Sequence, residues 1–413
     1  MSVPSATAAT AAVPASVPPG LAILVLALLL SIQPVTTDLY LPALPALTRS
    51  LGATLSAAQL TLSGLLLAFG ASQMVWGPLS DRFGRRPILI AGLSIYTAAS
   101  LGAALAPSMA LLIVWRIAQG AAMGAVVMSA RAIVRDLYTP LEGARAMSKS
   151  LTGLGIVACI CAPLGGLLSQ WLGWRAALFA LTLYAIATLA LVAWRMPETL
   201  MQRNPRALQP AMLVHHWMMI LRNPTFWAFS LQTTASYGGL FTFLAASSFV
   251  FIDVLGITRT HYGAVMASAC AAYFAGTFVC RGLLARHGLQ RTVAIAGGLS
   301  LAGGTLMAVV AFADWHQPWA LMAPFYLFML GHGIHQPCGQ SGAVGPFPRS
   351  AGVASALNGF MMMLVAFGIG GWLGVALDGT VWPLVGGIWF WSVALATISW
   401  TLVQQFGEPR EHA

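Results

Sequence analysis

Residues 87–115 read PILIAGLSIYTAASLGAALAPSMALLIVW, a run of 29 residues without a charged side chain. About 20 apolar residues allow a helix to cross the hydrocarbon core of a bilayer, which is about 30 Å thick. A segment in lipid must satisfy its own backbone hydrogen bonds, and a helix does so. The run therefore predicts a transmembrane helix.

Similar stretches lie on both sides of this run. Charge-free segments cover 1–37, 50–80, 150–174, 176–194, 223–252, 260–280, 292–313, 315–348, 350–377 and 379–407, and Arg116 interrupts a further apolar stretch near 109–130. Each is long enough to cross a membrane. Together they predict an all-α membrane protein with twelve transmembrane helices.

The composition supports this class and excludes others. Of 413 residues, 58% are hydrophobic and 7% charged, and the mean hydropathy is +0.81. Soluble domains carry about 25% charged residues, so a soluble enzyme, a disordered chain and a fibrous chain are excluded. We find no phosphate-binding loop, nucleophile triad or metal-ligand cluster, and we expect no enzyme activity, cofactor or metal. Five cysteines lie in apolar stretches without the spacing of a disulfide framework or zinc site: Cys159, Cys161, Cys270, Cys280 and Cys338.

The basic residues predict the orientation. With the N-terminus inside, sixteen lie on the cytoplasmic side, namely Arg82, Arg85, Arg86, Arg131, Arg135, Arg145, Lys149, Arg195, Arg203, Arg206, Arg222, Arg281, Arg286, Arg291, Arg349 and Arg410. Only Arg49, Arg175 and Arg259 lie on the other side. This asymmetry follows the positive-inside rule. It places both termini in the cytoplasm and explains the net charge of +10 without nucleic acid.

The longest polar connection divides the chain into two similar parts. We expect a disordered N-terminal tail (1–19), a six-helix half (20–194), a cytoplasmic linker (195–222), a second six-helix half (223–405) and a C-terminal tail (406–413). The tail lacks the basic region of a signal peptide. Residues 212–221 fit either an interfacial amphipathic helix or a plain linker. Two such halves are typical of transporters that bind substrate between them.

The connection between the second and third spans, residues 77–89, reads GPLSDRFGRRPIL. It resembles the loop signature of the major facilitator superfamily, which implies two pseudo-symmetric six-helix halves. The resemblance implies that Asp81 caps span eleven and that Arg85 meets Asp136 at the end of span four, as a conformational latch. The residues assigned to this latch are Gly77, Asp81, Arg82, Gly84, Arg85, Arg86 and Asp136. The alternative is a basic loop that only anchors the chain.

A weaker copy of this loop follows span eight, where residues 281–288 read RGLLARHG. Leu283, Arg286 and Gly288 match Leu79, Arg82 and Gly84, 204 residues earlier, but Ala285 replaces the acid. The copy indicates an internal duplication, with the latch chemistry confined to the first half.

The first span ends in TTDLYLPALP, residues 36–45. This resembles the bicyclomycin- and chloramphenicol-resistance (Bcr/CflA) branch of drug:proton antiporters. Asp38 is the only acid well inside a predicted span, where ionisation is costly. We therefore expect Asp38 to carry a proton and to release it when a ligand arrives. The alternative is a hydrated acid at the helix end, since two prolines follow.

Span four contains Arg116 in the pattern R-x-x-Q-G, which resembles the superfamily signature of this span. At 1.5 Å per residue, Arg116 lies about 10 Å and Asp38 about 13 Å below the outer ends of their spans. We therefore expect Arg116 to influence the protonation of Asp38, directly or through water. A structural arginine bonded to carbonyl groups remains the alternative.

Span five contains Ala162, Pro163, Gly165 and Gly166, which resemble the antiporter signature of the superfamily with alanine in place of its first glycine. The resemblance implies a bias toward export, and ordinary glycine packing is the alternative. In span ten, His332 and His335 share a helix face and fit either a proton relay or hydrogen-bonded packing. The candidates for a substrate cavity are Tyr40, Gln73, Gln119, Tyr237, Phe241, Tyr326, His332, His335 and Met362.

These patterns favour a monomeric, proton-coupled drug efflux antiporter of the bacterial inner membrane that works by alternating access. Its partners would be small hydrophobic or amphipathic drugs, protons and the bilayer. Two alternatives stay open at this point, since fold does not fix function. One is a proton-coupled importer or exporter of a small metabolite, and the other is a membrane sensor that transports nothing.

Overall fold

The computed structural model describes residues 18–138, 140–201, 203, 209–315 and 317–407. These residues form helices and connecting turns without a β-strand. Twelve helical segments are long enough to cross a membrane: α1 (Pro19–Asp38), α3 (Leu55–Phe83), α4 (Arg85–Ala104), α5 (Met109–Leu137), α6 (Pro140–Trp171), α7 (Trp174–Arg195), α9 (Pro224–Ser248), α10 (Arg259–Phe312), which crosses twice, α11 (Pro318–Val344), α12 (Ala351–Ala376) and α13 (Trp382–Trp400). The prediction of an all-helical, twelve-span membrane protein is confirmed.

Short helices complete the described chain. They are η1 (Leu41–Ala43), α2 (Leu44–Ser50), α8 (Pro210–Leu221), the π-helical η2 (Phe249–Val254), η3 (Pro348–Ser350) and α14 (Leu402–Phe406). The connection between α7 and α9 thus contains a helix, α8, whose Ile220 is buried against the second half of the chain. Most of the predicted tails, residues 1–17 and 408–413, lie outside the described residues.

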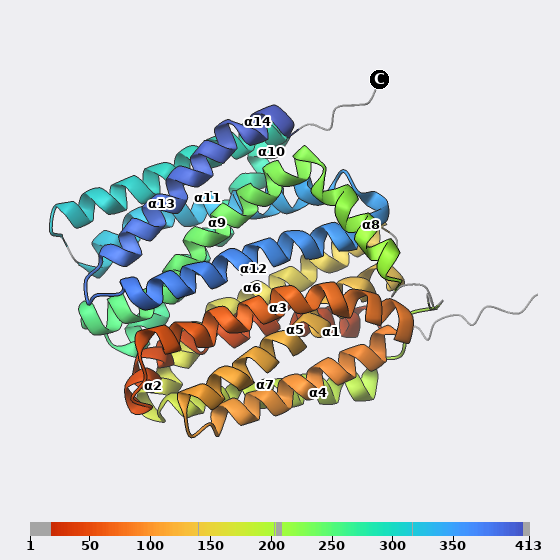
Figure 1. The fold of residues 1–413 in the computed structure, drawn as a ribbon, viewed down its shortest axis with the longest axis horizontal. Coiled ribbons are helices and arrows are strands. Elements are labelled where there is room, and N and C mark those ends of the chain that lie inside the picture. Colours follow the sequence, from red (N-terminus) through yellow and green to blue (C-terminus); the bar gives the residue numbers. More distant parts are fainter. Residues whose placement is uncertain (1–17, 139, 202, 204–208, 316, 408–413) are drawn as a thin grey trace, which may run out of the picture.

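The two halves meet along two pairs of helices. α3 packs along α12, and α6 packs along the first part of α10. Figure 1 shows α3 running beside α12. The second span is equivalent to the eighth and the fifth to the eleventh, so the two pairs are copies of one contact. The backbones approach closely in both: a β-carbon on Gly70 would lie 2.7 Å from Met363 Cβ, and one on Gly263 would lie 2.6 Å from Pro163 Cα.

Two glycines turn the chain at equivalent places. Gly84 has φ 111° and ψ 159° and separates α3 from α4. Gly288 has φ 71° and ψ −178° and is the one non-helical residue inside α10. Side chains other than hydrogen rarely tolerate this backbone region. The loop that we expected after the eighth span is therefore a single glycine kink, and its position supports the duplication inferred from the sequence.

This pair of glycines offers a matched stability test. A β-carbon at either position would be strained by about 1–3 kcal/mol, but at Gly84 it would also meet the Glu198 carboxylate, whereas Gly288 has open space around it. We expect Gly84→Ala to lower the thermal unfolding midpoint of the detergent-solubilised protein more than Gly288→Ala. Equal losses would contradict the close contact between Gly84 and Glu198.

Candidate functional site

A cavity of about 310 Å³ lies between the two halves. Side chains from α1, α3, α5 and α6 line it on one side, and side chains from α9 to α12 line it on the other. Its lining is largely apolar, with Phe69 and Phe243 among the aromatic residues. Among the residues that the structure describes, Asp38 is the only carboxylate in the lining and Arg131 the only arginine. Arg131 was not among the residues predicted to line a cavity.

Four of the nine predicted cavity residues line this space together with Asp38: Gln73, Tyr237, His332 and Met362. Five do not, namely Tyr40, Gln119, Phe241, Tyr326 and His335. Each of the five packs elsewhere. Tyr40 and Gln119 contact Arg116, Phe241 stacks on Tyr237, Tyr326 Oη lies 2.8 Å from Ser268 Oγ, and His335 Nδ1 lies 2.7 Å from Gln232 Nε2. Residue type alone did not reveal which helix face each occupies.

The two histidines both turn toward α9. His332 Nδ1 lies 2.8 Å from Ser236 Oγ, and the ring of His332 packs beside that of Tyr273 at 5.4 Å. His335 is fully buried at its bond to Gln232. Hydrogen-bonded packing therefore describes His335, whereas His332 also borders the cavity.

Asp38 is the last residue of α1 and is 8% exposed. Its Oδ1 accepts a hydrogen bond of 2.8 Å from Thr37 Oγ1. Asp38 therefore does stand at a helix end, as the alternative interpretation of a hydrated helix-terminal acid requires. The surroundings of this helix end are those of the cavity between the halves, so Asp38 can respond to what the cavity contains.

Arg116 is fully buried near the same helix end. It donates to Gln119 Oε1 at 2.7 Å and to the carbonyl oxygens of Thr61 and Thr36 at 3.3 Å. Its guanidinium also lies 4.3 Å from the centre of the Tyr40 ring. Within the described residues no ion pair joins it to Asp38. The direct form of the expected coupling is therefore absent, and Arg116 acts on the backbone two residues before Asp38.

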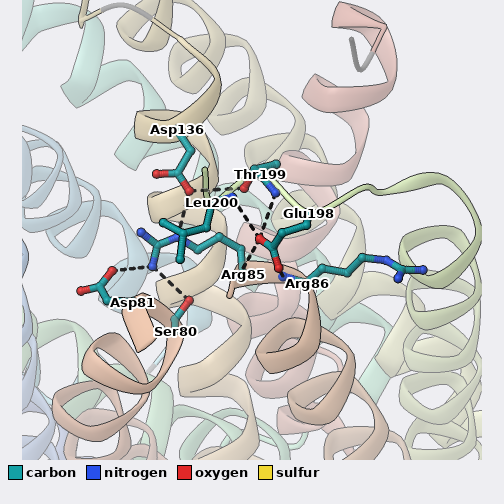
Figure 2. Close-up of polar contacts among 8 residues, drawn as sticks. All are labelled: Ser80, Asp81, Arg85, Arg86, Asp136, Glu198, Thr199 and Leu200. Carbon is teal, nitrogen blue, oxygen red and sulfur yellow. Dashed lines mark hydrogen bonds and ion pairs between the residues drawn. The ribbon is translucent and has the colours of Figure 1, made fainter. Parts of the chain in front are cut away.

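Figure 2 shows the ion-pair network at the start of α4. Arg85 Nε donates to Asp136 Oδ2 at 2.8 Å, and Arg85 Nη1 donates to Asp81 Oδ1 at 2.5 Å and to Ser80 Oγ at 3.2 Å. Asp136 Oδ2 also accepts a bond of 3.3 Å from Thr199 Oγ1. The structure thus brings together Asp81, Arg85 and Asp136. All of these residues precede the linker helix.

The other latch candidates have separate roles. Asp81 does not cap α12 in this structure: it pairs with Arg85, and the residue before α12, Ser350, makes no capping bond through its side chain. Arg82 is exposed beside the ring of Phe83 at 5.5 Å. Arg86 donates to the Ala193 carbonyl at 2.9 Å, and a β-carbon on Gly77 would touch Met128 Cε at 3.5 Å. Only Arg85 therefore ties the acids together.

Three of the four residues of the span-five signature pack against the opposite half. A β-carbon on Gly166 would lie 2.5 Å from the Arg259 carbonyl oxygen, whereas one on Gly165 would meet the Leu39 carbonyl of its own half. Ala162 and Pro163 lie against Gly263 of α10. Close packing is what the geometry shows for these four residues, and for Ala162, Pro163 and Gly166 it joins the two halves. An export bias stays a prediction.

Comparison with known proteins identifies the family to which this chain belongs. The family model of the Major Facilitator Superfamily matches residues 26–371. The chain belongs to this superfamily. Its members are membrane transporters rather than enzymes, and the chain is accordingly a multi-pass membrane protein.

Relatives within the superfamily have names that agree with the branch inferred from residues 36–45. The chain is 32% identical to a chloramphenicol resistance protein of Pseudomonas aeruginosa, over 87% of this chain and 84% of the relative. It is 33% identical to multidrug resistance protein D of Escherichia coli, over 82% and 84%. A bicyclomycin resistance protein homolog of Haemophilus influenzae is 24% identical, over 83% and 86%. The resemblance to the bicyclomycin- and chloramphenicol-resistance branch is confirmed.

A solved structure supports the fold. The crystal structure of a bacterial homolog of the human lysosomal transporter Spinster, described as inward-facing and unoccupied, aligns with a TM-score of 0.72. The alignment covers 94% of this chain and 97% of the other, at 16% sequence identity. This similarity shows that the two proteins share a fold.

Glu198, which follows α7, is a site residue that the sequence analysis missed. Its carboxylate accepts bonds from the backbone N–H groups of Arg85 at 2.9 Å and Arg86 at 3.3 Å, at the N-terminus of α4 (Figure 2). It also accepts from the N–H groups of Thr199 and Leu200. A helix N-terminus favours an anion, since its first N–H groups lack helical partners. Glu198 lies 113 residues from Arg85, so no local motif could have paired them.

The capping role of Glu198 predicts a clear effect on stability. Glu198→Gln removes the charge at the start of α4 and should cost about 1–3 kcal/mol. Asp253→Asn is the matched control, because Asp253 pairs with Arg49 where their side chains are 34% and 58% exposed, and such a pair contributes about 0–1 kcal/mol. We expect a larger fall in the unfolding midpoint for Glu198→Gln. Similar falls would show that Glu198 is only a surface charge.

Substitution of Arg116 should abolish transport without removing the protein from the membrane. Arg116→Ala should abolish transport while leaving normal amounts in the membrane, and Arg116→Lys should not restore it, since one ammonium cannot bond acceptors in three directions. The control is Arg175→Ala: Arg175 is exposed, donates to the Ala106 carbonyl and lies over the Trp174 ring. Efflux assays and membrane immunoblots measure both quantities. Normal transport by Arg116→Ala would show that transport does not depend on Arg116.

Proposed function

We propose that this chain is a proton-coupled drug efflux antiporter of the bacterial inner membrane, acting as a monomer by alternating access with both termini in the cytoplasm. The observation that carries the proposal is Asp38, a nearly buried acid that is the only carboxylate lining the cavity within the described residues. The names of the relatives, which refer to resistance against chloramphenicol, bicyclomycin and several drugs, supply the substrate class.

The mechanism follows from the position of this acid. A neutral carboxyl is stable in an apolar cavity, whereas a carboxylate needs a compensating group. A cationic or polar drug that enters from the cytoplasm or inner leaflet supplies that compensation, and Asp38 releases its proton. When the halves rock and the drug leaves outside, Asp38 takes up a proton again. The proton gradient thus drives export, with drug and proton exchanging at one site.

Contacts between the halves at one end of the bundle support alternation. At the end away from Arg85, the Arg49–Asp253 pair (2.6 Å) joins the halves, as does Ser56 Oγ, which donates to the Gly374 carbonyl at 2.8 Å. The cavity lining extends in the other direction, to Arg131 and Ser355. In this arrangement the cavity belongs to the cytoplasmic side, where the drug would enter.

Everted membrane vesicles test the role of Asp38. In acid-loaded vesicles, chloramphenicol or ethidium added outside should release protons through the wild-type protein, and acridine orange fluorescence reports this release. Asp38→Asn cannot bind and release a proton, so we expect drug-induced release to disappear. Asp378→Asn is the control, because Asp378 is an acid in an exposed turn, hydrogen-bonded to Thr380.

Two results would count against the proposal. Persistent drug-induced proton release by Asp38→Asn would show that another group carries the proton. Wild-type vesicles that move no drug from a broad panel, while intact cells take up a metabolite faster at acidic external pH, would instead favour a proton-coupled importer.

A further inference from the structure

Arg131 differs from the other arginines inside the bundle because it faces the cavity. It lies on α5, fifteen residues after Arg116, and is partly buried in the cavity lining. Its Nη1 donates a hydrogen bond of 3.2 Å to Ser355 Oγ, on α12 of the other half. Within the part of the chain that the structure describes, no carboxylate lies within ion-pair distance of Arg131.

This environment leaves most of the guanidinium's binding capacity unused. A guanidinium has five N–H donors and keeps its charge at all relevant pH values. Arg85 meets two carboxylates, and Arg116 meets three oxygen acceptors and an aromatic ring. A hydroxyl is a weak partner for a desolvated cation, and an anion placed beside it would be a much better one.

The cavity around Arg131 suits such an anion as part of a larger molecule. Amide side chains from three helices, Gln73, Gln340 and Asn358, line the same space. Asp38 belongs to the other end of the lining: Arg116 reaches the carbonyl two residues before it, and Arg131 follows Arg116 by about 22 Å of helix. Aromatic and methionine side chains lie in the lining as well. The cavity thus combines an acid, an apolar surface and a base at separate places.

We propose that Arg131 is a specificity-determining residue that binds the carboxylate of an amphipathic drug, so that zwitterionic drugs with an amine and a carboxylate are preferred substrates. This inference rests on the proposed function and names a substrate class for the same cavity. A carboxylate can accept two parallel N–H bonds from a guanidinium. The amine of the same drug would lie toward Asp38.

A matched pair of ligands tests the proposal directly. Norfloxacin carries both an amine and a carboxylate, and its methyl ester keeps the amine but loses the anion. We expect the purified full-length protein in detergent to bind norfloxacin about 10- to 100-fold more tightly than the ester, the range for a hydrogen bond to a charged group. Tryptophan fluorescence or calorimetry measures both affinities.

Variants of Arg131 then assign the preference to this residue. Arg131→Gln should bind acid and ester equally, and Arg131→Lys should keep part of the preference because it keeps the charge. Arg135→Gln is the control, since Arg135 lies one turn further on the same helix, is exposed and does not line the cavity. It should keep the full preference.

Several outcomes would overturn the proposal: no binding of either ligand, no preference in the wild type, or an unchanged preference in Arg131→Gln. Equal weakening of acid and ester by Arg131→Gln would also overturn it, since that result assigns Arg131 to the contact with Ser355. Vesicle transport separates this proposal from drug efflux itself. Export of both ligands without selectivity would refute only the role of Arg131, whereas preferential binding without any export would refute only the efflux function.

Discussion

A charged group inside a membrane bundle persists only where another group compensates it, and three arginines of the first half meet this constraint differently. Arg85 lies between two carboxylates, and Arg116 is enclosed by carbonyl oxygens, an amide and an aromatic ring. These two are satisfied by the protein and hold helices in place. Arg131 donates to the hydroxyl of Ser355 and faces the cavity. The degree of compensation thus separates structural charges from one that is available to a ligand.

The duplication explains why the cavity can lie between two rigid halves. The contacts of α3 with α12 and of α10 with α6 are copies of each other, and small residues let the backbones approach closely in both. The two copies differ in chemistry, because Asp81 has Ala285 as its equivalent. The ion pairs of Arg85 lie in the part of the chain before the linker helix.

Much of the architecture could be predicted from the sequence because membrane burial acts on every residue of a span. Charge-free runs located the twelve spans, and the repeated glycine of the loop copy marked the turns at Gly84 and Gly288. Asp38 was identifiable because an acid is rare in such a run. These signals are local, and each rests on a residue type that lipid or backbone geometry would otherwise exclude.

The rest of the site depends on contacts between distant segments. Glu198 reaches Arg85 across 113 residues, and nothing in the residues near Glu198 indicates that contact. The sequence also does not show which face of each helix lines the cavity. Phe241 and Tyr237 lie four residues apart on one helix, yet only Tyr237 borders the cavity. Arg116 was predicted to lie level with Asp38, and it donates to the carbonyl of Thr36, two residues before that acid. Its other acceptors are the Thr61 carbonyl, a group that every helix offers, and the side-chain amide of Gln119.

The position of the Arg85 network also bears on how a latch could work. Arg85 and Asp136 belong to the first half and Thr199 to the start of the linker, so in this conformation the network does not join the two halves. The side chain of Arg85 is 6% exposed and that of Asp136 16%, whereas that of Asp81 is 45% exposed. Asp81 is therefore the member that can leave without uncovering a buried charge, since Asp136 still compensates Arg85.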